Sequence, residues 1–181
     1  DGCRRGRTMS VVYIGIDPGG HGAVVGLPWS GSHAGTPIAV RADGPVGYQR
    51  GALKAGLTVS LYLDALRTVA HGCQVGGVLL EMPSTRPGES ASSGQRSGMH
   101  VGAWLGLLSA LGWPYEIVRP QAWRKLAGIV VTKGGDPKAA TLAAVMARVP
   151  DLDLMPGAVR TPHDGIADAA GLALAARGRF G

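Results

Sequence analysis

Short apolar runs near the start of the chain alternate with turn-forming residues. Val11–Ile16 is rich in β-branched residues and ends in Asp17-Pro18-Gly19-Gly20, a pattern typical of a strand that runs into a tight turn. Two further short apolar runs, Gly22–Leu27 and Pro37–Arg41, follow at the spacing of hairpins, with Gly, Ser and Pro between them. The chain up to Arg41 therefore predicts three strands.

Helical and extended patterns alternate in the rest of the chain. In Thr58–Ala70 the apolar residues recur near a period of 3.6, which predicts a helix. Gly77–Glu81 is a continuous apolar run that predicts a strand buried on both faces, and Pro114–Val118 predicts another strand. The segment Met82–Gly94, rich in Pro, Ser and Gly, predicts a loop. The remaining helices are expected over Gln95–Leu111, Gln121–Ala127, Lys138–Val149 and Asp164–Arg177.

This order of elements predicts an α/β fold. Three hairpin strands followed by alternating helices and strands give a mixed five-stranded sheet flanked by helices on both faces. The first and fourth strands can lie side by side and parallel, so that their carboxyl ends open on one edge, a usual place for a site. Asp1–Met9 contains three Arg and no apolar period, so we expect a disordered tail, followed by one domain over residues 10–181.

Length and composition narrow the class of protein. With 181 residues and 45% hydrophobic residues, the chain can form one domain with a core of ordinary size. No run of about 18 apolar residues occurs, so no membrane span is expected. Cys3 and Cys73 are too few for a disulfide framework and form no CxxC pair. The net charge of +6 and the pI near 9.8 suit a polyanionic partner.

Two acidic residues each close an apolar strand. Asp17 ends the first strand, where it either caps the following turn or faces a cation, because a carboxylate at the end of a buried strand needs compensation. Glu81 ends the fourth strand, where a solvated end paired with Arg is the alternative. Since the two strands are plausible neighbours, the two like charges would repel unless a divalent metal lies between them.

The last predicted helix carries two more acids on one face. Asp164 and Asp168 are four residues apart, so their Cβ atoms would lie about 6 Å from each other. Asp164 can also serve as an N-cap or as a first-turn acid favoured by the helix dipole. Asp168 sits among Ile166, Ala167 and Ala169, where a buried carboxylate needs a partner such as a metal ion.

The four carboxylates suggest a hard cation. Mg²⁺ or Mn²⁺ prefers acidic oxygens, whereas zinc prefers His and Cys. Two such ions about 3.5–4 Å apart would bracket an in-line displacement at phosphorus. An acidic site within a basic protein is what a metal-dependent nuclease requires, because the outlying Lys and Arg can hold phosphates.

Three stretches of the chain resemble the RuvC family of Holliday junction resolvases, within the ribonuclease-H-like superfamily. They are Ile14-Gly15-Ile16-Asp17-Pro18-Gly19, Leu80-Glu81 with the Gly/Ser loop after it, and the helix with Asp164 and Asp168. The stretch Val118–Lys125 is similar to a V-x-P-x-x-W-(R/K)-K motif of a branch that includes phage-type enzymes and the monokaryotic-chloroplast resolvases of plants and green algae. The likeness runs from about Val11 to Arg177.

The resemblance implies an activity and a set of site residues. It implies a ribonuclease-H-like fold and a structure-specific DNA endonuclease that resolves Holliday junctions by paired symmetrical nicks, with two Mg²⁺ or Mn²⁺ ions per active site. Asp17, Glu81, Asp164 and Asp168 would be the metal ligands, and His163 is an alternative to Asp164. The chloroplast-type likeness implies the chloroplast nucleoid as the compartment, with a bacterial or phage-infected cytoplasm as the alternative.

Several basic residues are candidates for contacts with DNA. Lys138 opens a predicted helix after Asp136-Pro137, where the resemblance implies a functional lysine that could stabilise charge at the scissile phosphate; on residue type alone, a surface lysine is the favoured alternative. The other candidates for phosphate contacts are Arg86, Arg96, Arg124, Lys125 and Lys133.

Two opposite strands of a two-fold-symmetric junction must be cut, so a homodimer is expected. Gly94, Gly98, Gly102 and Gly106 recur every four residues, and we place this helix face at the dimer interface as a hypothesis. Three alternatives remain at this point: an actin-like or sugar-kinase-like phosphotransferase, a non-cutting structure-specific DNA-binding module, and an RNA-processing nuclease of the same fold. The length of the chain disfavours the first, because such folds need two domains.

Overall fold

The computed structural model describes residues 10–19, 21–30, 33–42, 48–49, 52–53, 55–83, 90–157 and 160–181. The tail expected over Asp1–Met9 and the candidate phosphate contact Arg86 lie outside these residues.

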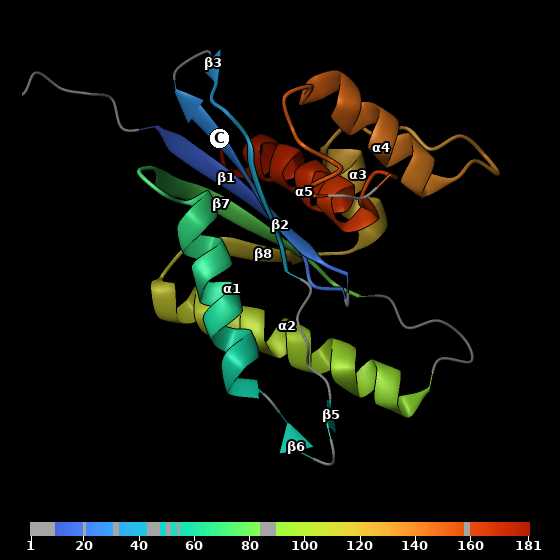
Figure 1. Ribbon diagram of the computed structural model, residues 1–181. Helices are drawn as coiled ribbons and strands as arrows, with labels where there is room; N and C mark the ends of the chain where they lie inside the picture. The colour runs from blue at the N-terminus through green and yellow to red at the C-terminus, as the bar shows by residue number, and fades with distance from the viewer. Residues whose placement is uncertain are drawn as a thin grey trace, which may run out of the picture.

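A mixed sheet lies at the centre of the described chain (Figure 1). β1 (Val11–Asp17) pairs antiparallel with β2 (Ala23–Ser30) on one side and parallel with β7 (Gln74–Glu81) on the other. β8 (Tyr115–Val118) extends the sheet parallel to β7, and β4 (Ile38–Arg41) extends it antiparallel to β2. The five predicted strands and the parallel first and fourth strands are confirmed.

Three short strands were not predicted. β3 (His33–Ala34) pairs with the end of β2 that β4 leaves unpaired. β3 and β4 thus lie on the same side of β2, and the sheet has six strands. β5 (Tyr48–Gln49) and β6 (Ala52–Leu53) form a separate two-stranded hairpin. These pairs of residues are too short to carry an apolar period, so the sequence pattern could not reveal them.

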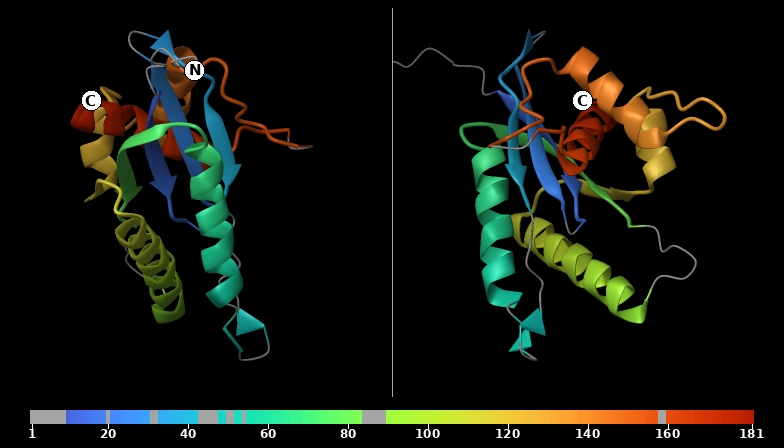
Figure 2. Two further views of the ribbon diagram at one scale, coloured as in Figure 1. Left: turned by 90° about the vertical axis from the view of Figure 1, so that its left-hand side faces the viewer. Right: turned by 45° about the vertical axis from the view of Figure 1, so that its right-hand side comes forward.

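Helices cover both faces of the sheet (Figure 2). α1 (Ala55–Val69) and α2 (Ala91–Leu111) pack on the face that carries Ile14, Ile16 and Leu80. α3 (Pro120–Leu126), α4 (Pro137–Arg148) and α5 (Asp164–Phe180) cover the opposite face. This is the α/β arrangement that the order of the elements predicts. None of the helices in the described ranges is long and apolar enough to cross a membrane.

The start of α2 differs from the sequence-based expectation. The helix begins at Ala91, four residues before Gln95, so the loop predicted over Met82–Gly94 is wrong for its last residues. Ser90 is the N-cap, and its hydroxyl accepts a hydrogen bond from the Ser93 backbone N–H at 3.2 Å. This capping bond stabilises a first turn of Ser and Gly residues, whose composition by itself suggests a loop.

Close packing of β1 against α5 fixes the position of the last helix. A Cβ atom added at Gly15 would lie 2.0 Å from the Ala169 carbonyl oxygen and 2.4 Å from the Ala173 backbone nitrogen. The helix backbone therefore rests directly on the strand at a residue that has no side chain. This contact sets α5 at the depth at which its first turns reach the end of β1.

Candidate active site

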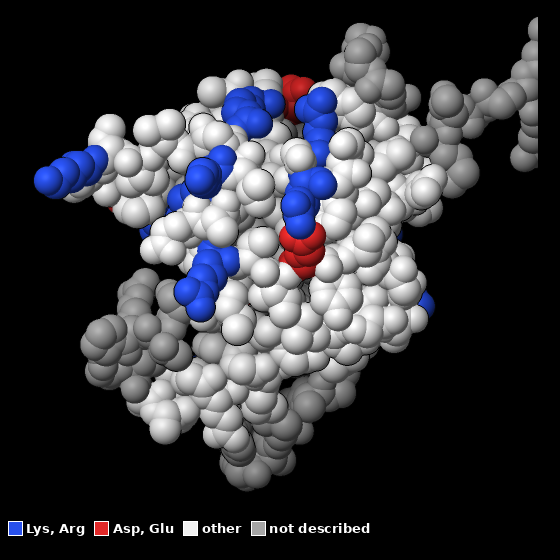
Figure 3. Space-filling view, turned by 180° about the vertical axis from the view of Figure 1, so that it is seen from behind, with Lys and Arg blue, Asp and Glu red and all other residues white. Residues whose placement is uncertain are grey.

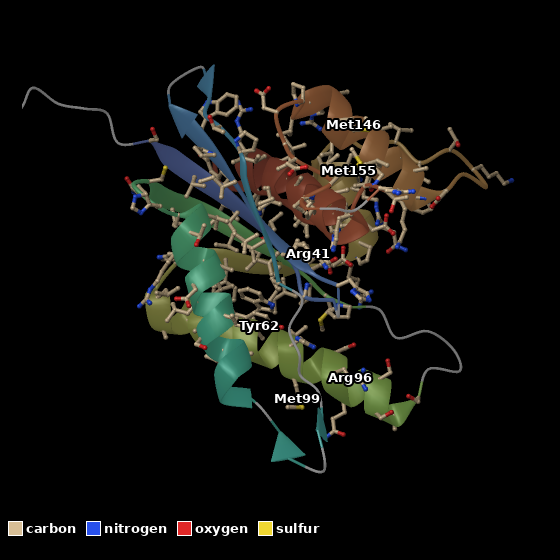
Figure 4. The ribbon with its side chains drawn as sticks, viewed as in Figure 1. Arg41, Tyr62, Arg96, Met99, Met146 and Met155 are labelled. Atoms are coloured by element: carbon tan, nitrogen blue, oxygen red, sulfur yellow. The ribbon has the colours of Figure 1, made fainter. Side chains whose placement is uncertain are left out.

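A cavity of about 600 Å³ opens where the end of β1 meets the first turns of α4 and α5. Asp17 comes from β1, Lys138 from α4, and Asp164 and Asp168 from α5. Arg41, at the end of β4, lines the cavity as well and is labelled in Figure 4. The carboxyl ends of β1 and β7 lie at one edge of the sheet, as the parallel pairing predicts, but Glu81 at the end of β7 does not line this cavity.

Asp17 is the last residue of β1, and its side chain faces the first turn of α5. Its Oδ1 accepts a hydrogen bond from the Gly19 backbone N–H at 3.0 Å, so the residue also caps the turn, as the alternative interpretation has it. A Cβ atom at Gly165 would lie 3.2 Å from Asp17 Oδ2, which shows how closely the helix approaches. Burial, together with the charges of Glu81 and Asp168, raises the pKa of Asp17 to about 7.

Glu81, the last residue of β7, points toward α3. Its Oε2 accepts a hydrogen bond from the Trp123 indole Nε1–H at 2.5 Å. Burial and the nearby charge of Asp168 raise the pKa of Glu81, whereas the Trp123 hydrogen bond and the charge of Arg124 lower it. The carboxylate is therefore held by a buried donor, unlike the solvated strand end that was the alternative.

The two acids of α5 have different surroundings. Asp164 is exposed in the first turn, where its Oδ2 lies 2.6 Å from Lys138 Nζ. The N-cap is His163, whose Nδ1 accepts a hydrogen bond from the Ile166 backbone N–H at 3.2 Å, so Asp164 is the first-turn acid and not the cap. Asp168 is mostly buried, and burial is the main cause that raises its pKa.

Arg124 does not lie where a phosphate contact was expected. Its guanidinium is mostly buried, with Nη2 3.7 Å from Asp168 Oδ1 and Nε donating a hydrogen bond to Thr141 Oγ1 at 3.2 Å. Arg124 thus pairs with Asp168, the buried acid for which the sequence suggested a metal ion as partner. Lys125 and Lys133 are exposed, as a phosphate contact requires. Arg96 is exposed on α2, across the sheet from α4 and α5 (Figure 4).

The donor set fits a hard divalent cation in its chemistry. Asp17, Glu81 and Asp168 converge from three elements, and their burial and mutual repulsion hold all three pKa values above the usual range. A divalent cation would relieve that repulsion. As the side chains lie, no group of three or more His, Cys, Asp or Glu within the described ranges is arranged to hold a metal ion. Arg124 and Lys138 pair with Asp168 and Asp164, so these two carboxylates would have to turn from their partners toward the ion.

Sequence reasoning missed several residues of this region. His21, Arg41 and Thr161 line the cavity, although neither their spacing nor their surroundings in the sequence set them apart. The Trp123 side chain is fully buried, and nothing in the sequence indicates its hydrogen bond to Glu81. The V-x-P-x-x-W motif marked the residue without indicating its partner.

Positive charge predominates on one broad face of the molecule. Figure 3 shows Lys and Arg spread over the surface seen from behind, with few Asp or Glu among them. The exposed basic residues of α3, α4, α5 and their flanking segments include Arg119, Lys125, Lys133, Arg148, Arg177 and Arg179. Such a face suits a polyanion.

The sheet order, the helices on both faces and the acids at the strand ends define an α/β protein with a ribonuclease-H-like fold. Two solved structures share it: RuvC of Thermus thermophilus in complex with a Holliday junction substrate, and a second Thermus thermophilus RuvC structure. The first has a TM-score of 0.58 and 18% identity over 92% of this chain and 91% of that chain. The second has a TM-score of 0.55 and 21% identity over 92% of each chain. No family model and no curated protein matches the sequence. The chain therefore has a RuvC-like fold.

Proposed function

We propose that this protein is a structure-specific DNA endonuclease that cuts four-way junctions. The observation that carries the proposal is the convergence of Asp17, Glu81 and Asp168, from two parallel strand ends and one helix, in surroundings that leave their charge undercompensated. The RuvC-like fold supports the choice of substrate, because one of its structural neighbours is bound to a Holliday junction.

In the proposed reaction the chain's residues hold the cations and orient the phosphodiester. Asp17, Glu81 and Asp168, with Asp164 at the rim, would hold one or two Mg²⁺ or Mn²⁺ ions. When bound, these ions supply activation of the attacking water and stabilisation of the leaving 3′-oxygen. Lys138 lies at the rim of the cavity, where its ammonium can contact a phosphate that displaces it from Asp164. The products would be a 5′-phosphate and a 3′-hydroxyl that can be ligated.

The proposal includes a homodimer. Paired nicks on opposite strands need two active sites related by a two-fold axis, which a C2 dimer provides. The glycines of α2 support this, because a Cβ atom at Gly94, Gly98, Gly102 or Gly106 would meet no atom of the described chain within 4 Å. The likeness of Val118–Lys125 to the chloroplast-type motif supports the chloroplast nucleoid as the compartment.

The test is cleavage of end-labelled DNA with and without Mg²⁺. We expect metal-dependent nicks at symmetrical positions on opposing arms of a synthetic four-way junction, and little cutting of linear duplex of the same sequence. Asp17→Asn should bind the junction but not cut it, whereas Asp151→Asn, a change at an exposed aspartate, should cut normally. Cutting by the Asp17→Asn variant at the normal rate would refute the metal site. Preferential cutting of structured RNA would favour an RNA-processing enzyme of the same fold.

A further inference from the structure

Trp123 connects two parts of the chain that meet only in the folded protein. Glu81 is the register partner of Val118 in the parallel pair of β7 and β8, and the Met82 backbone N–H donates to the Val118 carbonyl at 2.8 Å. Pro120 then begins α3 with only Arg119 between it and the end of β8. This short connection returns the chain toward β7 and places Trp123 beside the Glu81 carboxylate.

The Trp123 indole is held in place by α5 and by Arg124. The Trp123 side chain is fully buried, and a Cβ atom at Gly171 of α5 would lie 2.6 Å from its Cζ3. The Arg124 guanidinium lies over the ring, 4.6 Å from its centroid. A ring packed against a helix backbone cannot turn away, so its N–H holds a constant direction. Within the described chain, Trp123 is the hydrogen-bond donor to the Glu81 carboxylate, and it engages Oε2 at 2.5 Å.

We infer that Trp123 is a positioning residue that fixes the Glu81 carboxylate for cation binding, an inference that rests on the proposed function. By holding Oε2, the indole leaves Oε1 as the oxygen to be offered to a divalent ion. A carboxylate that is already oriented loses less conformational entropy when the ion binds. Partners of metal ligands typically change metal affinity by about 10- to 100-fold when removed.

The chain supplies a matched control. Trp104 is also fully buried, and its indole Nε1–H has no hydrogen-bond partner in the described chain. Trp104→Phe therefore removes the same ring volume from the core as Trp123→Phe but breaks no hydrogen bond. The difference between the two variants isolates the contact with Glu81.

The first experiment titrates Mn²⁺ alone, without DNA, into the whole 181-residue chain by calorimetry. We expect Trp123→Phe to weaken Mn²⁺ binding by about 10- to 100-fold, and Trp104→Phe to leave it within about twofold. Equal affinities of the two variants, with tight binding by the unsubstituted protein, would overturn the positioning role alone. No Mn²⁺ binding by the unsubstituted protein would overturn the proposed function and this inference with it.

A second measurement does not require the Trp123 variant to fold. In the ¹⁵N-labelled protein, the indole N–H resonance of Trp123 should shift when Mg²⁺ is added and when Glu81 is replaced in Glu81→Gln. The Trp104 indole resonance should move in neither case. An unchanged Trp123 resonance in Glu81→Gln would show that the indole does not hold this carboxylate, and the inference would fail.

Discussion

Lys138 Nζ lies 2.6 Å from Asp164 Oδ2, at the rim of a cavity whose floor holds two more carboxylates. The hydrogen bond to Asp164 is the main cause that raises the pKa of Lys138, and the charges of Asp168 and Asp17 add to it. The lysine therefore stays charged in the pH range in which a nuclease works. Both side chains are more than half exposed, so the ion pair contributes little to the stability of the fold. Its position at the rim lets Lys138 leave Asp164 and contact a phosphate instead.

Lys138→Gln should slow DNA cleavage strongly while changing the stability of the fold very little. Because the ion pair is exposed, we expect the free energy of unfolding to change by less than about 1 kcal/mol. Junction cleavage should fall by about 10²- to 10³-fold, since a charge near the reacting phosphate is lost. Single-turnover cleavage and denaturant unfolding measure the two effects, and the control is Arg67→Gln, which breaks another exposed ion pair, on α1 at the opposite face of the sheet. A rate equal to that of the control would remove Lys138 from the reaction.

Asp17→Asn should stabilise the metal-free protein in a pH-dependent way. The folded-state pKa of Asp17 is raised to about 7 from 3.8, so the folded protein binds a proton that the unfolded chain has lost. The unsubstituted protein therefore loses stability as the pH rises from about 4 to about 7. Asp17→Asn does not, because its amide side chain does not ionise. The difference in the free energy of unfolding should grow to a few kcal/mol over that interval. Added Mg²⁺ should shrink it, because the ion binds the ionised carboxylate.

Urea unfolding of both proteins at several pH values, with and without Mg²⁺, measures this difference. Asp151→Asn serves as the control, since an exposed aspartate should give a difference near zero throughout. A difference that stays constant between pH 4 and 7 would contradict the raised pKa.

Arg124→Met should leave the buried Asp168 carboxylate without its cationic partner. The guanidinium lowers the pKa of that buried carboxyl, and its removal leaves the acid near Asp17 and Glu81 with less compensation. We expect the metal-free protein to lose about 1–3 kcal/mol at pH 8 and less near pH 4, because the raised pKa of Asp168 favours proton binding by the carboxyl as the pH falls. Thermal unfolding at both pH values measures the effect. Arg119→Met, at an exposed arginine just before α3, should change stability equally little at either pH.

Gly15→Ala should disrupt the packing of β1 on α5. The added methyl group would lie 2.0 Å from the Ala169 carbonyl oxygen, and that oxygen belongs to the helix backbone and cannot rotate away. We expect a loss of at least about 3 kcal/mol, or no folded protein. Gly178→Ala adds the same methyl group 3.7 Å from the Leu126 carbonyl oxygen, and should stay within about 1 kcal/mol. Similar unfolding curves for the two variants would contradict the close approach.

Gly102→Glu tests the proposed dimer. A side chain at Gly102 meets no atom of the described chain within 4 Å, so the subunit itself should tolerate it. If the glycine face of α2 packs against a second copy, the charged side chain should shift the protein from dimer to monomer in sedimentation at micromolar concentration. Unchanged circular dichroism would show an intact subunit. A monomer before any substitution would refute the homodimer.

The sequence by itself determined the sheet strands that frame the site. Val11–Ile16 and Gly77–Glu81 are continuous apolar runs, and such runs report burial through local composition. Because each run ends in an acid and parallel neighbours end at one edge, the meeting of Asp17 and Glu81 follows from pattern and topology together. The two-residue strands and the Ser90 cap left no comparable signal.

Only the tertiary structure decided which side chain partners each acid. Asp168 lies beside Arg124, Glu81 accepts from Trp123, and Asp164 pairs with Lys138. Each pair joins different elements, from 26 residues apart for Lys138 and Asp164 to 44 for Arg124 and Asp168. Periodicity describes how one element faces the core, but it carries no information on how far one helix slides or rotates against another. Here that depends on close contacts such as those at Gly15 and Gly171, which exist only once the chain has packed.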